Sequence, residues 1–299
     1  MNDRPALLIA NPHSRHGEAK QRQALEALER HGIAVTHADW QPENLTRIIA
    51  AEAAAVRAVI VAGGDGTLNA AAQGLIDTGL PLGILPMGTA NDLARTLAIP
   101  TDLDAAVRII AEGRLRRIDI GMANGIPFFN VASVGFGVDL TRALTRDSKR
   151  RWGTLGYGIA ALRALRRMRP FTAHITEGDE VHVSRTVHLA VGNGRHYGGG
   201  MTIAGDADID DHRLDVFSLE VSSIWQLARL LPALRSGRHD AWTEIRTLAG
   251  KAIEVRTRRS RSVNLDGEIR TRTPVCFTVR AGAISVYTPA EAEGSAAGG

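Results

Sequence analysis

The amino-acid sequence predicts an α/β protein of two domains, a doubly wound domain followed by an antiparallel β-sandwich. Up to about residue 116, apolar runs alternate with helical patterns, as in parallel strands joined by right-handed crossover helices. Beyond this residue, short apolar runs are separated by glycine and Asx turns, which is typical of antiparallel strands. With 299 residues and 44% hydrophobic residues, the chain can build a core for each domain.

The first domain alternates strands and helices. We expect strands in residues 6–10, near residue 35, and in residues 56–62 and 82–85, and helices in residues 18–31, 45–52, 68–76 and 103–112. Asn44 and Asp102 are suited to cap two of these helices, because Asx side chains accept hydrogen bonds from the first N–H groups of a helix. In doubly wound sheets ligands bind beyond the carboxyl ends of the strands. The loops that follow these strands are therefore expected to meet at one edge.

The second domain consists mainly of short strands. They are expected in residues 128–133, 173–176, 187–191, 214–219, 253–256, 275–279 and 284–287, with two helices in residues 156–168 and 223–236. Cys276 is the single cysteine, which excludes an internal disulfide, and we expect it to be a buried strand residue. Residues 289–299 are small and polar and are predicted to be disordered.

The segment 63–69, GGDGTLN, joins an apolar β-branched strand to a predicted helix. Its glycines let the backbone approach a ligand closely, and the N–H groups of the following helical turn can bind an anion. The segment matches neither GxxxxGK[ST] nor GxGxxG. Asp65 would repel a phosphate unless a divalent cation or a sugar hydroxyl lay between them. We interpret the segment as a phosphate-binding turn, the alternative being a tight structural turn.

Two more polar loops follow predicted strands of the first domain. Residues 11–17 begin with Asn11, and residues 86–92 read PMGTAND. Both are candidates for the same phosphate site. Asn91 and Asp92 can equally well start a helix through local hydrogen bonds.

Two acidic segments of the second domain also allow a functional and a structural interpretation. Residues 265–268, LDGE, can be a simple hairpin turn. If the second domain folds over the cleft, Asp266 or Glu268 could instead be the base that a phosphoryl acceptor needs. Residues 205–212, GDADIDDH, can coordinate Ca²⁺ or Mg²⁺, or form a solvated acidic turn.

Composition restricts the partners. Residues 149–169 combine basic and apolar side chains, so a helix there could lie on an anionic membrane surface or pack on its own domain. No apolar run has the length or continuity of a signal peptide or a membrane span, and a cytoplasmic protein is expected. A formal net charge of only +4, an aromatic content of 4% and the lack of a nucleic-acid-binding module argue against nucleic acid as a partner.

Six motifs together resemble the diacylglycerol kinase catalytic-domain family, in particular its soluble bacterial lipid kinases of YegS and diacylglycerol kinase type. They are GGDGTLN (63–69), ILPMGTANDLAR (84–95), NVASVGFGVD (130–139), YGGGM (197–201), IDDHRLDV (209–216) and LDGE (265–268). GGDG alone is shared with NAD kinases and phosphofructokinases, whereas the combination is specific. The similarity covers about residues 5–288.

The resemblance implies a domain organisation. Residues 1–121 would form a Rossmann-like nucleotide-binding domain of the NAD kinase/phosphofructokinase kind. Residues 122–275 would form a β-sandwich domain that binds the lipid acceptor. In the family the last strands return to the first domain, which here implies residues 276–288.

The resemblance also assigns roles to residues. The nucleotide would be contacted by Asn11, Gly64, Asp65, Gly66, Thr67, Leu68, Asn69, Ala70 and Thr89. Asp65 would act with a catalytic Mg²⁺ and Asp92 would lie near the acceptor. Glu268 matches the proton acceptor, with Asp266 as the alternative.

A second, structural metal ion would be held by the side chain of Asp211 and by backbone oxygens of Asp208 and Arg213. Here the sequence departs from the family, because the common DDG reads Asp210-Asp211-His212. A residue that tolerates positive φ is thereby lost.

The leading hypothesis is an ATP-dependent, Mg²⁺-requiring lipid kinase that works peripherally at a membrane surface. One alternative is a kinase of a soluble hydroxyl compound such as NAD or a sphingoid-like metabolite. Another is a catalytically silent regulator that binds a nucleotide or a lipid. The sequence leaves the acceptor lipid and the oligomeric state open, a homodimer included.

Overall fold

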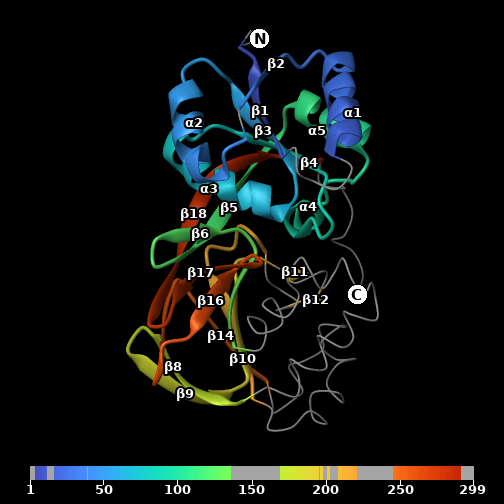
Figure 1. Cartoon of the computed structure of the whole chain (residues 1–299). Coiled ribbons are helices and arrows are strands. Elements are labelled where there is room, and N and C mark those ends of the chain that lie inside the picture. The colour runs from blue at the N-terminus through green and yellow to red at the C-terminus, as the bar shows by residue number, and fades with distance from the viewer. Residues whose placement is uncertain are drawn as a thin grey trace, which may run out of the picture. The chain divides into compact units, whose positions relative to one another are not determined.

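The computed structural model describes residues 4–11, 17–38, 40–135, 169–194, 196–197, 201–202, 208–220 and 245–290. The chain divides into two compact units, Met1–Ile118 with Ala283–Gly299, and Asp119–Gly282 (Figure 1). It passes from one unit to the other in β5 (Leu115–Ala123) and β18 (Val275–Tyr287), and the predicted boundaries at residues 121 and 276 lie in the same two strands. The helices predicted in residues 156–168 and 223–236, and the tail beyond residue 290, lie outside the described residues.

The first unit is built on a parallel sheet. Its strands are, in order across the sheet, β2 (Val35–His37), β1 (Ala6–Ala10), β3 (Ala58–Gly63) and β4 (Leu82–Pro86), with the end of β18 beside β4. Helices α1 (Gly17–Arg30) and α5 (Leu103–Glu112) pack together on one face, and α2 (Leu45–Glu52) and α3 (Asp65–Thr78) on the other (Figure 1). Every residue of β3 is buried, because helices cover both faces of this central strand. The doubly wound prediction is confirmed.

The helix starts differ from the prediction in one important place. Helix α3 begins at Asp65 rather than near residue 68, so GGDGTLN contains the first turn of the helix and not only the loop before it. Asp102 caps α5 as expected, since its side chain accepts a hydrogen bond from the N–H of Ala105 at 2.9 Å. The prediction for Asn44 was wrong: Asn44 lies in a 3-10 turn (Pro42–Asn44), and its side chain donates to Gln41 instead of capping α2.

The second unit contains two antiparallel sheets. One has the order β14 (Ile245–Gly250), β13 (Leu214–Leu219), β10 (His188–Gly192), β7 (Val131–Gly135), β16 (Ser262–Leu265) and β17 (Glu268–Arg272). The other joins β18 to β15 (Ala252–Thr257), β8 (Phe171–Glu177) and β9 (Glu180–Thr186), and β5 pairs with β6 (Ile126–Phe128). A two-stranded ribbon, β11 (His196–Tyr197) with β12 (Met201–Thr202), completes the described strands.

Side chains from both sheets form one hydrophobic core. Alternate residues of each strand face inward, for example Leu189 and Val191 from one sheet and Ala173 and Ile175 from the other. This confirms the predicted sandwich.

Some strands differ from the prediction. Residues 128–133 do not form one strand, because the chain breaks between β6 and β7. Residues 275–279 and 284–287 belong to the single strand β18. Cys276 lies in β18 but is exposed, so the prediction of a buried cysteine was wrong. The strand alternates, and its neighbours Val275 and Phe277 take the inward positions. Within the described parts of the chain, no helix is long and apolar enough to cross a membrane.

The buried histidine of β10 makes the stability of the second unit depend on pH. Burial lowers the pKa of His188 from 6.5 to about 4. The unfolded chain therefore takes up a proton at this residue near pH 6.5, whereas the folded chain does not until about pH 4. We expect the free energy of unfolding to fall as the pH decreases through this range, by about 1.4 kcal/mol per pH unit from this group alone.

Thermal unfolding between pH 7.5 and pH 4.5 tests this expectation. The variant His188→Gln should be less stable at pH 7.5, and its stability should decrease less steeply towards acid than that of the unchanged protein. His174→Gln, at an exposed position of β8, is the matched control and should keep the original slope. Equal slopes for the two variants would contradict the assignment.

Candidate functional site

The loops after three parallel strands lie at the same edge of the first sheet. Ala10 at the end of β1 is in register with Ala62 of β3, and Gly63 is in register with Pro86 of β4. The N–H of Met87 donates to the carbonyl of Gly63 at 2.9 Å, so the second and third loops leave the sheet side by side. Asn11 follows β1 directly. The alternation of strands and helices predicted this convergence.

The second and third loops touch through their backbones at two glycines. A Cβ atom on Gly64 would lie 2.9 Å from the Cα atom of Gly88, and one on Gly88 would lie 2.6 Å from the Cα atom of Gly64. No side chain fits at either position. Asn91 holds the third loop in place, because its Oδ1 accepts from the N–H of Gly88 at 2.9 Å and its Nδ2 donates to the Gly88 carbonyl at 3.1 Å. Asn91 is itself left-handed, with φ 49°, and buried.

The contact between the loops brings two carboxylates together. Asp65 is the first residue of α3, and its Oδ1 accepts from the N–H of Leu93 at 3.3 Å, in the short helix α4 (Asp92–Thr96). Burial raises the pKa of Asp65, and the negative charge of Asp92 raises it further. The Oδ1 of Asp92 lies 3.5 Å from Nη1 of Arg95. A carboxylate whose ionised form is disfavoured, close to a second carboxylate, fits a Mg²⁺ ion, which needs one or two protein carboxylates besides phosphate oxygens.

The remaining predicted nucleotide residues fall into two groups. Thr67 and Leu68 are buried in the first turns of α3, and Leu68 belongs to the hydrophobic core. Asn69, Ala70 and Thr89 are at least partly accessible. The Oδ1 atom of Asn69 is buried and has no hydrogen-bond partner among the described residues. A buried acceptor without a donor, in the helix that follows the glycine turn, fits a polar ligand such as a nucleotide.

The structure separates the two acids of LDGE. Asp266 has a left-handed backbone, with φ 44°, and its carboxylate accepts three backbone N–H groups. Oδ2 lies 2.6 Å from the nitrogen of Phe129, and Oδ1 lies 3.0 Å and 2.8 Å from those of Asn130 and Val131. These bonds satisfy the backbone where β6 ends and β7 begins, which explains the break in the predicted strand. Asp266 therefore holds the turn.

Glu268 has a different environment. It is the first residue of β17, its side chain is 53% exposed, and it pairs with Arg270 of the same strand at 3.1 Å. An exposed carboxylate that pairs with one exposed cation can accept a proton from a substrate. Sequence spacing does not distinguish Asp266 from Glu268, but the structure shows that only Glu268 has an exposed carboxylate.

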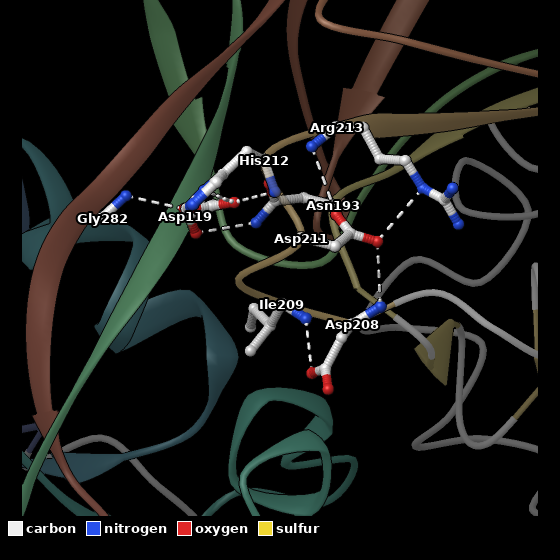
Figure 2. A network of polar contacts seen from close by, with 8 residues as sticks. All are labelled: Asp119, Asn193, Asp208, Ile209, Asp211, His212, Arg213 and Gly282. Carbon is white, nitrogen blue, oxygen red and sulfur yellow. Dashed lines mark hydrogen bonds and ion pairs between the residues drawn. The ribbon is translucent and has the colours of Figure 1, made fainter.

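The predicted structural-metal residues share one loop, residues 208–213 (Figure 2). Asp211 accepts from the backbone nitrogen of Asp208 through Oδ2 and from that of Arg213 through Oδ1, both at 3.2 Å. Metal binding by Asp208, Asp211 and Arg213 stays a prediction. Residues 136–139 and 198–200, which belong to two of the predicted motifs, lie outside the described residues.

Asp119 was missed by the sequence analysis. It is buried in β5 with 1% exposure, and its Oδ1 and Oδ2 accept from the backbone nitrogens of Gly282 at 2.7 Å and His212 at 2.6 Å. Asn193 donates from Nδ2 to the Asp119 carbonyl at 2.8 Å (Figure 2). The sequence offers one signal for Asp119, its position between two isoleucines of an apolar strand. An acid in such a strand is expected to be buried, and a buried acid needs strong hydrogen-bond donors.

Comparisons with known protein families cover almost the whole chain. The model of the diacylglycerol kinase catalytic domain matches residues 5–123, and that of the YegS C-terminal NAD kinase beta sandwich-like domain matches residues 132–288. The chain is 34% identical to a diacylglycerol kinase of Mycobacterium tuberculosis over 94% of each chain. It is 32% identical to a Pseudomonas aeruginosa protein named "Probable lipid kinase YegS-like", over 94% of this chain and 91% of that one.

Solved structures show the same fold. A protein from Bacillus anthracis str. Sterne superposes with a TM-score of 0.80 at 25% identity, over 97% of this chain and 99% of the other. A structure of a diacylglycerol kinase from the same organism superposes with a TM-score of 0.74 at 23% identity, over 97% and 98%. The second likeness is one of fold alone.

Asp65→Asn should stabilise the protein in the absence of nucleotide and divalent cation. An acid whose pKa is raised by folding contributes stability below its ordinary pKa of 3.8, and loses that contribution as the pH rises through the raised value. At pH 7 the neutral amide removes this cost, and we expect the melting temperature to rise by about 2–4 °C. Asp179→Asn, in an exposed turn, should leave it unchanged. A lower melting temperature for Asp65→Asn would show that the carboxylate is not under electrostatic strain.

Proposed function

The chain belongs to the diacylglycerol kinase catalytic-domain family of lipid kinases, and from that premise we propose that it transfers the γ-phosphoryl group of ATP to a hydroxyl group of diacylglycerol or a related lipid. The observation that carries the proposal is the backbone contact of Gly64 with Gly88, which brings two loop backbones together in the segments that contain Asp65 and Asp92. Such a site suits a polyphosphate, because backbone N–H groups can reach its oxygens.

The carboxylates of Asp65 and Asp92 would hold the catalytic Mg²⁺. When bound, Mg²⁺ supplies positive charge that offsets the phosphate charge during transfer. The raised pKa of Asp65 supports this assignment, because a bound cation would offset both the burial of this acid and the nearby charge of Asp92. The buried Oδ1 of Asn69 would accept a hydrogen bond from the nucleotide. Asn11, Gly66, Ala70 and Thr89 stay predicted nucleotide contacts.

Glu268 would act as the base and Asp266 as a positioning residue. The hydroxyl oxygen of the lipid attacks the γ-phosphorus, the bond from that phosphorus to the β,γ-bridging oxygen breaks, and ADP leaves. The hydroxyl proton passes to the Glu268 carboxylate. Asp266 is poorly suited to take it, since three backbone N–H groups donate to its oxygens and stabilise the ionised form.

Diacylglycerol is the proposed acceptor because relatives that match 94% and 77% of this chain are named diacylglycerol kinase. The reaction would take place at a membrane surface, with the protein bound peripherally from the cytoplasmic side. Incubation with γ-labelled ATP, Mg²⁺ and vesicles containing diacylglycerol should give labelled phosphatidic acid. Label in another lipid of a mixed extract would correct the acceptor. Label in a water-soluble product, or none over a broad panel, would refute lipid phosphorylation.

Glu268→Gln should lower kcat about 10²–10⁴-fold, because the amide cannot accept the proton, while ATP binding and melting temperature stay unchanged. The control is Glu254→Gln on β15, because Glu254 also pairs with an arginine two residues later on its strand, at 2.9 Å. It should keep full activity. Steady-state kinetics and calorimetric titration with ATP give these values.

Asp266→Asn separates the two acids. The amide presents one acceptor oxygen to three N–H donors, so we expect a melting temperature lower by several degrees, with the residual activity following the folded fraction. If instead Asp266→Asn abolished turnover at unchanged stability and Glu268→Gln were active, the assignment of the base would be reversed.

A further inference from the structure

The loop 208–213 carries its own cation. We propose that the guanidinium group of Arg213 supplies the positive charge that balances Asp211 and Asp215, so that this loop closes without the structural metal ion that its acidic sequence predicted. The inference concerns the stability of the second unit and does not depend on the reaction proposed above. It follows from the surroundings of Asp211, of Arg213 and of His212.

The carboxylate of Asp211, the one side chain predicted to bind the ion, already has protein partners on both oxygens. Oδ1 accepts from the backbone nitrogen of Arg213 and Oδ2 from that of Asp208, both at 3.2 Å. Nε of Arg213 lies 3.2 Å from Oδ2 as well (Figure 2). A metal ion at Oδ2 would have to displace one of its two donors, the backbone nitrogen of Asp208 or the guanidinium group of Arg213. Oδ2 therefore fits the guanidinium group in place of a metal ion.

Arg213 lies between two carboxylates. Its Nε is 3.2 Å from Asp211 and 3.7 Å from Oδ1 of Asp215, which is two residues further along and enters β13. The side chains are 35%, 22% and 12% exposed for Arg213, Asp211 and Asp215, so water screens the pairs only partly. A guanidinium group tethered to the same loop is present at a high effective concentration. A dissolved divalent ion has to compete with it for the carboxylates.

The other side of the loop is anchored on Asp119. Asp119 donates its N–H to the carbonyl of Ile209 at 2.8 Å and accepts the N–H of His212 at 2.6 Å. Nδ1 of His212 lies 3.1 Å from both carboxylate oxygens. Among the described residues, no three His, Cys, Asp or Glu side chains are grouped so as to hold a metal ion.

His212 takes the backbone conformation that glycine would take, with φ 62°. This region is unfavourable for a residue with a Cβ atom, so other contacts must offset the strain. The two contacts with Asp119 are suited to do so. The loop thus keeps the left-handed turn although it lacks the glycine, and Arg213 closes it from the other side.

Thermal unfolding with and without divalent cations tests the proposal. The experiment uses the variant Asp65→Asn without nucleotide. Cation binding at Asp65 and Asp92 then does not contribute to the melting temperature. The melting temperature should be the same in EDTA and in Mg²⁺ or Ca²⁺. Adding Arg213→Leu should lower it by about 2–4 °C in EDTA, and either cation should restore part of the loss in a saturable way, because the guanidinium group that pairs with Asp211 is then absent.

Arg246→Leu is the matched control. Arg246 lies on the neighbouring strand β14, outside the loop, and its Nε pairs with Glu220 at 2.8 Å. Its side chain is about as exposed as that of Arg213. Its loss of stability should not respond to cations. His212→Gly should also stay insensitive to cations, because Arg213 remains in place.

Two results would overturn the proposal. One is a melting temperature of the protein with native Arg213 that falls in EDTA and recovers in Mg²⁺ or Ca²⁺. The other is an unchanged melting temperature for Arg213→Leu. If Arg213→Leu does not fold, Asp211→Asn decides: the proposal requires a loss of stability that is equal in EDTA and in cation, whereas a metal site requires a loss in cation only.

Discussion

The backbone contact between Gly64 and Gly88 is the constraint on which the first unit's site depends. It arises because β1, β3 and β4 end in register, so that their loops leave the sheet side by side. The contact permits no side chain at either glycine, and Asn91 has to adopt a left-handed conformation to hold the third loop. Closing the loops also buries Asp65 beside Asp92, which raises the pKa of Asp65. The packing that brings the two loops together thus also disfavours the ionised form of Asp65, and a bound cation would favour it again.

Carboxylates in this protein differ in function because their donors differ. Asp266 accepts three backbone N–H groups and joins two strands, Asp119 accepts backbone N–H groups from two distant segments, and Asp211 faces a guanidinium. Asp65 also accepts backbone N–H groups, one of them from Leu93 at 3.3 Å, but its burial and the charge of Asp92 outweigh them and raise its pKa. An acid whose charge is well stabilised by donors is suited to build structure, whereas an acid whose ionised form is disfavoured is a candidate for chemistry.

Much of the fold could be predicted from the sequence. The alternation of buried strands with helices indicated the parallel sheet, and the regular turns after residue 116 indicated the sandwich, because both are local patterns of apolar residues. The errors have two kinds of cause, a tertiary contact in one case and local contacts in the others. The break between β6 and β7 exists because Asp266 binds the backbone there, and Asn44 fails to cap because its side chain bonds to Gln41. Cys276 is exposed because its neighbours Val275 and Phe277 take the inward positions of the strand.

The sequence by itself determined the family, the two-part architecture and the segments that form the candidate site. These are carried by residue types at short spacings, and short spacings act through local backbone geometry. Only the tertiary structure decided which acids are available. The partners of Asp266 and Asp119 lie up to 137 and 163 residues away along the chain, so no local pattern contains them. A hydrogen bond between such distant residues exists only once the sheets have formed, and this bond identifies Asp266 and Asp119 as carboxylates that hold the structure together.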